Sequence, residues 1–226
     1  MPDSPQTKQI YIGRFAPSPT GPLHFGSLVS ALASYLDAHH NHGKWLVRME
    51  DLDPPREQAG AAQAILQCLD DYGLHWDDEI VYQSQRLDIY EEYLQRLTKR
   101  DLIYPCDCSR QDLQAMGGIY NGHCRTKHVE ASHPHALRLK LYDLPAEENI
   151  FPDDTLKFTD TIQGKQQQNL RTEAGDQILK RKDSLFAYQL AVVTDDIEQH
   201  ITHIIRGSDL LDVTARQIFL YKLLHA

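Results

Sequence analysis

Three of the four cysteines lie close together in the chain and have the spacing of a metal site. Cys106 and Cys108 are two positions apart, and Cys124 follows 16 positions later. This clustering favours a bound metal over a disulfide framework. Structural zinc takes four ligands, commonly thiolate or imidazole, so the residues alone suggest His123 as the fourth ligand. Three free thiols are the alternative, and Cys68 is expected in the core.

A second stretch, APSPTGPLHFGSL at residues 16–28, has the composition of a turn that leads into a helix. The start of a helix offers free backbone N–H groups and the positive end of the helix dipole, and both favour phosphate. Gly26 has no side chain to keep a phosphate away, and His24 could donate hydrogen bonds to phosphoryl oxygens as they gain charge. The alternative is a turn capped by Ser27, with His24 on the surface.

Two residues of opposite charge, Arg14 and Glu50, end two predicted neighbouring strands. The segment EDLDPP at residues 50–55 closes the second of these strands. In open parallel sheets, ligands bind beyond the carboxyl ends of the strands. The turn at residues 16–28 and the segment 50–53 both lie at such an end, which is a first indication of function; for Arg14 and Glu50 themselves, the residues alone favour a structural ion pair.

Strands alternate with helices in the first hundred residues, which predicts an α/β fold with a parallel sheet. The expected strands are Ile10–Phe15, Lys44–Met49 and the short Ile80–Tyr82. The expected helices are Ser27–His39, Glu57–Asp71 and Arg86–Arg100. The first helix carries apolar residues at helical spacing, namely Leu28, Val29, Leu32 and Leu36.

The pattern changes between about Tyr104 and Arg181. Residues 135–141 and 156–162 alternate as antiparallel strands do, which indicates an insertion. The earlier alternation is expected to resume with residues 185–194, including a strand that carries Tyr188. Residues 201–205 and an amphipathic helix from about Asp212 to Leu224 follow.

The composition is that of a globular protein, with 41% hydrophobic and 24% charged residues among 226. No segment has the length of a membrane span, and the first residues lack the order of a secretory signal, so we expect a cytoplasmic protein. The net charge of −9 argues mildly against nucleic-acid binding, because phosphate contacts need lysine and arginine. A local basic excess occurs at residues 171–182.

His24-Phe25-Gly26-Ser27 resembles the His-x-Gly signature of class I aminoacyl-tRNA synthetases. Further strings follow it in order: VRMEDLDPPRE, CDC…GGIYNGHCR, FAYQLAVVTDD and THIIRGSDLL…ARQIFLY. Together they resemble the catalytic core of glutamyl-tRNA synthetases, and HFGSL, DLDPPRE and GGIYNGHC are closer to their short paralogues, the glutamyl-Q tRNA(Asp) synthetases. The resemblance covers about residues 10–221. It implies a Rossmann-like catalytic domain (residues 1–105 and 185–226), interrupted by a zinc-bearing α+β insertion (residues 106–184).

The resemblance also implies the substrate-binding residues. Those for glutamate are Arg14, Ala16, Ser18, Glu50, Tyr188 and Arg206, and those for ATP are Pro17, His24, Gly26 and Ser27. Arg14 and Arg206 would bind the two carboxylates, a task that suits the guanidinium fork. Glu50 would accept the α-ammonium group, and His24 and Gly26 are the implied catalytic residues.

For the metal site, the family pattern is Cys-x-Cys followed by Tyr-x-x-x-Cys, with a tyrosine oxygen as the fourth ligand. In this chain the implied set is Cys106, Cys108, Tyr120 and Cys124, and His123 is the alternative fourth ligand. The resemblance implies one structural Zn²⁺.

Residues 180–184, KRKDS, superficially resemble the second signature of class I synthetases, a lysine-rich KMSKS loop. In the family that loop follows the segment that matches RGSDLL…ARQIFLY, whereas residues 180–184 precede it. We therefore interpret them as a solvated basic face before Tyr188. The chain is expected to end before a KMSKS-type loop.

The implied activity is a two-step ligase reaction in a monomer. ATP, with Mg²⁺, would activate glutamate to glutamyl-adenylate, and the glutamate would pass to the queuosine base of tRNA(Asp). The alternatives are a truncated glutamyl-tRNA synthetase that charges tRNA(Glu), a tRNA-free ligase or nucleotidyltransferase, and an inactive zinc-bearing binding module.

Overall fold

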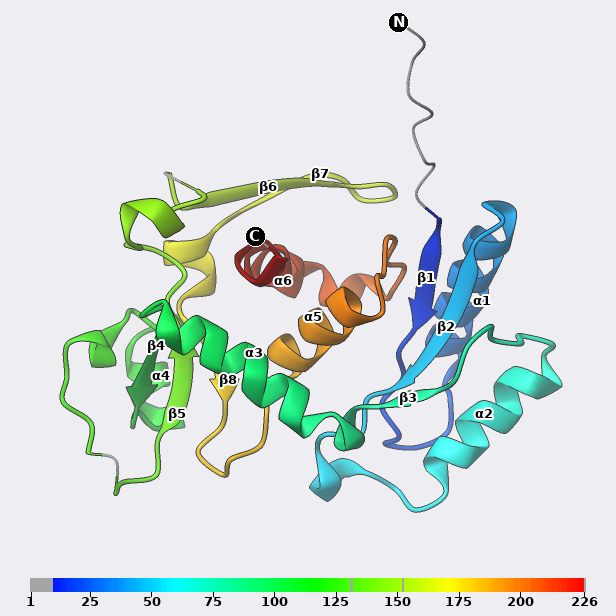
Figure 1. Cartoon of the computed structure of the whole chain (residues 1–226), viewed down its shortest axis with the longest axis horizontal. Helices are drawn as coiled ribbons and strands as arrows, with labels where there is room; N and C mark the ends of the chain where they lie inside the picture. Colours follow the sequence, from blue (N-terminus) through cyan, green and yellow to red (C-terminus); the bar gives the residue numbers. More distant parts are fainter. Residues whose placement is uncertain (1–9, 131, 152, 226) are drawn as a thin grey trace, which may run out of the picture. The chain divides into compact units, whose positions relative to one another are not determined.

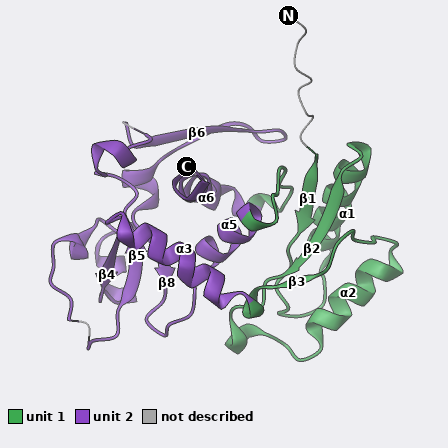
Figure 2. Ribbon diagram, in the orientation of Figure 1, with its two compact units in different colours: residues 1–85, 198–208 green, residues 86–197, 209–226 purple. Residues whose placement is uncertain are grey.

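The structure is a computed structural model that describes residues 10–130, 132–151 and 153–225. The described residues form two compact units (Figure 2). The first contains residues up to 85 together with 198–208, and the second contains residues 86–197 and those from 209 onward. The predicted division of the chain at residues 105 and 184 stays a prediction.

The first unit is built on a parallel sheet in the order β1-β2-β3 (Figure 1). Its strands are β1 (Ile12–Phe15), β2 (Lys44–Met49) and β3 (Val81–Tyr82), and its helices are α1 (Phe25–His40) and α2 (Ala61–Asp71). The predicted α/β fold with a parallel sheet is confirmed. Short 3-10 turns at Pro54–Arg56 and Gln83–Gln85 follow β2 and β3.

Helix α1 forms as predicted, but the residues that gave it helical periodicity are not its buried side. Val29, Leu32 and Leu36 are exposed, whereas Ala31, Ser34 and Ala38 are buried. Small side chains allow the helix backbone to lie close to the sheet, and the buried Ser34 hydroxyl accepts a hydrogen bond from Trp45 Nε1 at 2.9 Å. Close approach to the sheet thus decides which face is buried.

Helix α2 begins at Ala61 instead of the predicted Glu57. The prolines of the turn Pro54–Arg56 start a separate 3-10 element, and Gly60 then takes a left-handed conformation with φ of 78° before the helix. Its buried face includes Ile65 and Leu69, while Cys68, expected in the core, is only half-buried.

The second unit contains antiparallel strands, as predicted for the region between Tyr104 and Arg181. A sheet has the order β4-β5-β8, and β6 and β7 form a separate hairpin. These strands are β4 (Ile103–Cys106), β5 (Ala136–Leu139), β6 (Thr155–Asp160), β7 (Gly164–Asn169) and β8 (Gln177–Lys180). The helices are α3 (Leu87–Lys99), α4 (Arg110–Ala115), α5 (Tyr188–Glu198) and α6 (Leu211–His225), and a π-helical turn covers Leu170–Ala174.

Two predicted strands are wrong. Tyr188 begins helix α5, in which residues 190–196 are all buried. A helix buried on every side shows a continuous apolar run, which resembles a buried strand in sequence. Residues 201–205 form no strand, although the Thr202 N–H donates to the Ile12 carbonyl at 2.9 Å. The Ile12 N–H donates to the Thr202 side-chain oxygen at 2.8 Å, so a hydroxyl takes the place of a ladder carbonyl.

Candidate functional site

The turn after β1 is held in place by the segment that follows β2. The buried Pro17 and Pro19 have carbonyl groups that accept hydrogen bonds from Glu50 N at 2.9 Å and Gln58 N at 3.0 Å. Proline restricts φ, so the ring conformations and these bonds together define the turn. Ser18, between the two prolines, is exposed. The two proline rings and these two hydrogen bonds therefore fix the conformation of the turn.

His24, and not Ser27, caps helix α1, so the alternative of a serine cap is wrong. The Ser27 N–H donates to His24 Nδ1 at 3.2 Å, and Ser27 Oγ lies 2.9 Å from His24 Nε2. A Cβ added to Gly26 would lie 3.1 Å from His24 Cε1, which is tighter than ordinary contact. Gly26 thus makes room for the imidazole ring, and both residues are exposed at the start of the helix.

Buried charges occupy the carboxyl ends of β1 and β2. Arg14, on β1, is buried, and Glu50 directly follows β2 with a side chain that is 7% exposed. Arg48, which the sequence analysis did not single out, lies on β2 with its Nη2 atom 3.8 Å from Glu50 Oε1. A charged residue that interrupts the apolar run of the strand was the available signal.

The acidic segment after β2 is fixed by local hydrogen bonds. Asp51 accepts bonds from the Ser84 N–H at 2.9 Å and the Ser84 hydroxyl at 2.6 Å, and Asp53 pairs with Arg56 at 2.6 Å. Burial and the negative charges of Asp51 and Asp53 raise the pKa of Glu57 above its usual range. These contacts stabilise the loop on which Glu50 lies.

The remaining predicted pocket residues divide between the units. Ala16 and Arg206 are half-buried residues of the first unit, which also contains Ser18. Tyr188, at the first position of α5, belongs to the second unit. The first unit therefore contains all the predicted glutamate and ATP residues except Tyr188.

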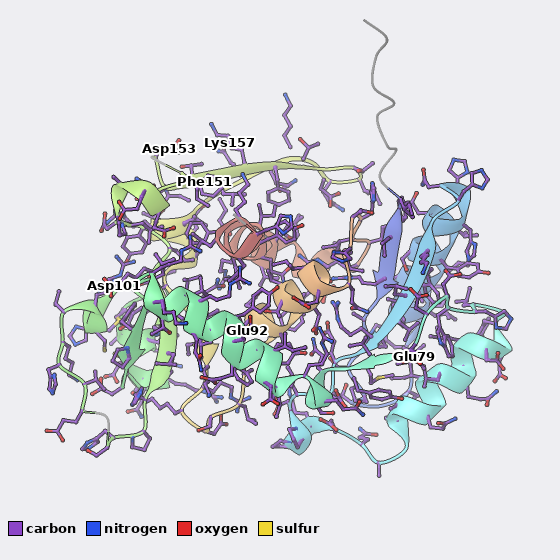
Figure 3. All side chains as sticks on the ribbon, viewed as in Figure 1. Glu79, Glu92, Asp101, Phe151, Asp153 and Lys157 are labelled. Atoms are coloured by element: carbon purple, nitrogen blue, oxygen red, sulfur yellow. The ribbon has the colours of Figure 1, made fainter. Side chains whose placement is uncertain are left out.

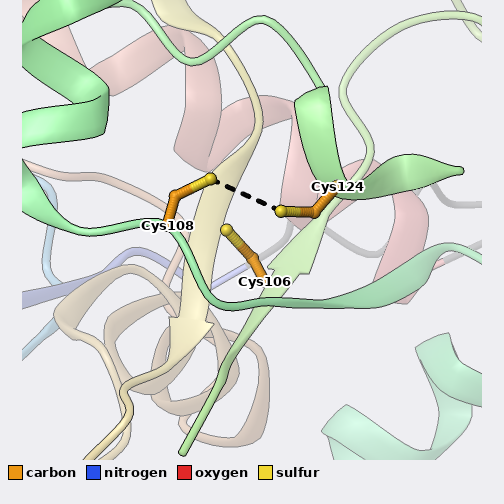
Figure 4. A group of neighbouring side chains, drawn as sticks. All are labelled: Cys106, Cys108 and Cys124. Atoms are coloured by element: carbon orange, nitrogen blue, oxygen red, sulfur yellow. Dashed lines mark hydrogen bonds between the residues drawn. The ribbon is translucent and has the colours of Figure 1, made fainter. Parts of the chain in front are cut away.

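The three clustered cysteines come together in the second unit (Figure 4). Their Sγ atoms all lie within 4.8 Å of one another, and those of Cys108 and Cys124 are 3.4 Å apart with no disulfide. Zn–S bonds of about 2.3 Å in a tetrahedron place sulfur atoms about 3.8 Å apart. The sulfur positions therefore fit a zinc ion.

Tyr120 also lies at this cluster. Its hydroxyl oxygen is 3.4 Å from Cys106 Sγ and 3.9 Å from Cys108 Sγ, and it accepts a bond from the Cys124 N–H at 2.8 Å. His123 is exposed. Among the His, Cys, Asp and Glu residues that the structure describes, only the three cysteines form this group of ligand atoms, and His123 does not belong to it. The geometry favours the tyrosine oxygen over the imidazole.

Arg138 contacts two of these four residues at once. Its Nε atom donates to Cys106 Sγ at 3.2 Å, and its guanidinium carbon lies 3.8 Å from the centre of the Tyr120 ring. Burial acts to raise the pKa of Cys106, but its hydrogen bonds with Tyr120 and Arg138 outweigh burial and lower that pKa. Burial and the hydrogen bond with Cys124 raise the pKa of Cys108 to about 12.

The cluster is assembled by the ends of short elements. Cys106 ends β4, and Cys108 precedes helix α4, which starts with a reciprocal cap between Ser109 and Asp112. Gly175 is required near Tyr120, because a Cβ there would lie 2.5 Å from the Tyr120 carbonyl oxygen. Backbone contacts thus hold the tyrosine beside the thiols.

The basic stretch 180–184 makes contacts within the second unit. Lys180 pairs with Glu91 at 2.8 Å, Arg181 pairs with Asp183 at 2.7 Å, and Lys182 donates to the Asp107 carbonyl at 2.7 Å. Residues 182–184 are exposed, in agreement with the interpretation as a surface face. A search of the described helices found none with the length and apolar character needed to cross a membrane.

Comparison with known proteins gives the chain relatives over nearly its whole length. Residues 12–226 match the family model of the class I tRNA synthetase (E and Q) catalytic domain. A glutamyl-Q tRNA(Asp) synthetase of Pseudomonas putida KT2440 is 52% identical over 99% of this chain and 71% of its own length. One from Vibrio vulnificus CMCP6 is 49% identical over 96% of this chain and 68% of its own length.

Among solved structures, a glutamate-tRNA synthetase from Elizabethkingia anophelis has a TM-score of 0.82 and 29% identity. A glutamate tRNA ligase from Elizabethkingia meningosepticum, solved in complex with its amino acid, has a TM-score of 0.81 and 30% identity. They cover 96% and 95% of this chain, which spans 48% and 47% of theirs.

Proposed function

The chain belongs to the class I tRNA synthetase (E and Q) catalytic-domain family, and from this premise we propose that it activates glutamate with ATP and transfers it to the queuosine base of tRNA(Asp). The observation that carries the proposal is the gathering of the buried Arg14 and the half-buried Glu50 with the exposed start of α1 in one unit, on a parallel sheet. The names and identities of the relatives support this choice of amino acid and acceptor.

In the first step, an α-carboxylate oxygen of glutamate attacks the α-phosphorus of ATP. The bond to the bridging oxygen breaks, and glutamyl-adenylate and pyrophosphate form. His24 and the N–H groups at the start of α1 would stabilise the charge that develops on the phosphoryl oxygens. Mg²⁺, bound with the nucleotide, supplies charge neutralisation. In the second step a nucleophile of the queuosine base takes the glutamyl group, and AMP leaves.

Glutamate carries two carboxylates and one ammonium group, and the proposed pocket has the complementary charges. Arg14 and Arg206 would bind the carboxylates, and Glu50 would accept the ammonium group. Ala16, Ser18 and Tyr188 would line the pocket, while Pro17, Gly26 and Ser27 would lie against ATP. Since Arg14 is buried and the Glu50 side chain is only 7% exposed, their charges act with little screening by solvent.

The test is glutamate-dependent exchange of pyrophosphate into ATP in the absence of tRNA. It is followed by transfer of labelled glutamate to tRNA(Asp) with and without queuosine. We expect exchange without tRNA, and transfer only to the queuosine-containing tRNA. Exchange without queuosine-dependent transfer would contradict the proposed acceptor, and no exchange would contradict the proposed activation step.

A second candidate, charging of tRNA(Glu), has the support of the solved glutamate-tRNA synthetases. Transfer of glutamate to the 3′ end of tRNA(Glu) in the same assay would favour it over the first.

We also propose that Cys106, Cys108, Tyr120 and Cys124 hold one structural Zn²⁺ in the insertion predicted at residues 106–184. The sulfur spacing and the nearby tyrosine oxygen support this set. Zinc would link β4, helix α4 and the turn at Cys124, and it supplies no chemistry to the transfer. We expect Tyr120→Phe to lower zinc occupancy and His123→Ala to keep it. The reverse result would make His123 the ligand.

A further inference from the structure

A buried arginine in β2 provides the starting observation. The Arg48 side chain has no exposed surface, and the strand on which it lies pairs with β1 on one side and β3 on the other. A guanidinium group in such a place is costly unless charged or polar partners compensate it. Its partners therefore indicate what the residue does.

Two of those partners come from segments that are far apart in the chain. One is Glu50, whose Oε1 atom is 3.8 Å from Arg48 Nη2. The other is Gln199, whose side-chain oxygen accepts a hydrogen bond from Arg48 Nη1 at 2.8 Å. Two arms of a single planar group thus point to two different segments of the first unit.

The segment that begins at Gln199 leads to Arg206, and further contacts hold it on β1. Thr202 exchanges two hydrogen bonds with the Ile12 backbone, at 2.8 and 2.9 Å. The His203 ring stacks on Tyr11 at 4.0 Å. Because Gln199 lies before these contacts, its bond to Arg48 fixes the beginning of the segment.

We propose that Arg48 is a positioning residue of the glutamate pocket. One arm of its guanidinium holds the Glu50 carboxylate at the end of β2, and the other holds the segment that carries Arg206. This inference rests on the proposed function, because it takes Glu50 as the acceptor of the ammonium group and Arg206 as a carboxylate ligand. The rigid fork of arginine suits such a double contact, which a lysine cannot reproduce.

Two ligands separate the two arms. Glutamate carries the ammonium group, and glutarate has both carboxylates without it. Calorimetric titration of each into the wild type and the variants Arg48→Met, Arg48→Lys and Gln199→Leu gives an affinity ratio of glutamate to glutarate. Lys44→Met is the matched control, because Lys44 begins the same strand and its ion pair with Asp78 is exposed.

We expect Arg48→Met to weaken glutamate binding about 10- to 100-fold, as for loss of hydrogen bonds to a charged group, and to lower the ratio. Gln199→Leu should weaken both ligands by a similar factor and leave the ratio unchanged. Arg48→Lys should keep the ratio, because its charge remains near Glu50, while both affinities fall. Lys44→Met should change neither affinity.

A purely structural role for Arg48 predicts a lower thermal midpoint with an unchanged ratio in every variant, and that result would overturn the inference. If Arg48→Met does not fold, the lysine and leucine variants still decide, since unchanged affinities in both overturn it. If the wild type binds glutamate and exchanges pyrophosphate, and the variants bind glutamate equally well, only the role of Arg48 is contradicted. A wild type that binds no glutamate removes the proposed function as well.

Discussion

The first unit holds its candidate pocket with charges, whereas the second holds its candidate metal site with packing. Arg14 lies on β1, whereas Arg48 lies on the neighbouring strand β2 and Glu50 directly follows it. The cysteine cluster comes from residues 106–124, its sulfur atoms lie within 4.8 Å of one another, and the Tyr120 oxygen lies 3.4 and 3.9 Å from two of them. A pocket of charges needs its substrate to balance them, while a local thiol cluster needs a metal to keep its ligands ionised.

The second unit also contains buried charges, in a network that reaches the cysteines through Arg138. Asp176, itself buried, accepts hydrogen bonds from Arg125 Nε and Nη2, both at 2.6 Å, and from the Leu141 N–H at 2.9 Å. Its backbone carbonyl accepts a bond from Arg138 at 2.7 Å. The charges of the second unit are therefore compensated within the protein.

Removal of the metal should produce the largest effect. Cys108→Ser, or dialysis against a strong chelator, removes a ligand set whose binding stabilises small zinc domains by about 10 kcal/mol or more. We expect the thermal midpoint to fall by roughly 6 °C or more, which corresponds to about 3 kcal/mol for a chain of this size. Calorimetry with zinc analysis measures both. Cys68→Ser is the control, and equal losses in both variants would contradict the metal site.

Neutralisation of Glu50 should have the next largest effect. Glu50→Gln keeps the shape of the side chain but removes the charge opposite the substrate ammonium group and Arg48. We expect kcat/KM for glutamate in the exchange assay to fall about 100-fold, equivalent to about 2.7 kcal/mol. Zinc content should stay unchanged. A variant with normal glutamate kinetics would show that the first unit does not recognise the ammonium group through this residue.

Replacement of Arg138 tests whether charge also matters in the second unit. Arg138→Met removes the bond to Cys106 and the contact with the Tyr120 ring, and residues that support metal ligands typically contribute 10- to 100-fold in affinity. We expect a loss of about 10-fold in zinc affinity, measured by competition with a chromogenic chelator. Lys140→Met is the control, because the partner of Lys140, Asp101, lies in the turn after α3 (Figure 3), and this variant should not change zinc affinity. Equal zinc affinities in the two variants would show that the charge of Arg138 does not support the metal ligands.

The smallest expected effect concerns an ion pair on the rim of the second unit. Arg100 hydrogen-bonds to Glu148 and lowers the pKa of that carboxyl below its usual range. A lowered folded-state pKa stabilises the protein above the unfolded pKa, and this stability is lost as the pH falls through the folded value. We expect Glu148→Gln to lose no more than about 1 kcal/mol at pH 7, since the pair is partly exposed.

The difference between the wild type and Glu148→Gln should shrink as the pH falls below the usual glutamate range. Denaturant unfolding at a series of pH values measures it. A difference that does not change with pH would mean that the ion pair contributes through packing instead of charge.

Local patterns predicted most of the regular elements of the fold. Strand β2 has the predicted bounds, and the helices α1, α3 and α6 differ from prediction by at most two residues at an end. Helix α5 was mistaken for a strand, because the run LAVVTDD is buried all around and carries no periodicity. The π-helical turn at 170–174 was not predicted, since no local pattern specifies it.

Residue types and spacing alone suggested the proposed chemistry: thiols for a metal and a helix start for phosphate. They left the partners undetermined, because a pairing depends on distances between segments that local sequence does not encode. Folding brought Tyr120 to the thiols, placed the His24 ring over Gly26, and joined Arg48 to Glu50 and Gln199. A buried charge must be compensated by whatever the fold places beside it, and one of the polar partners of Arg48, Gln199, lies 151 residues away along the chain.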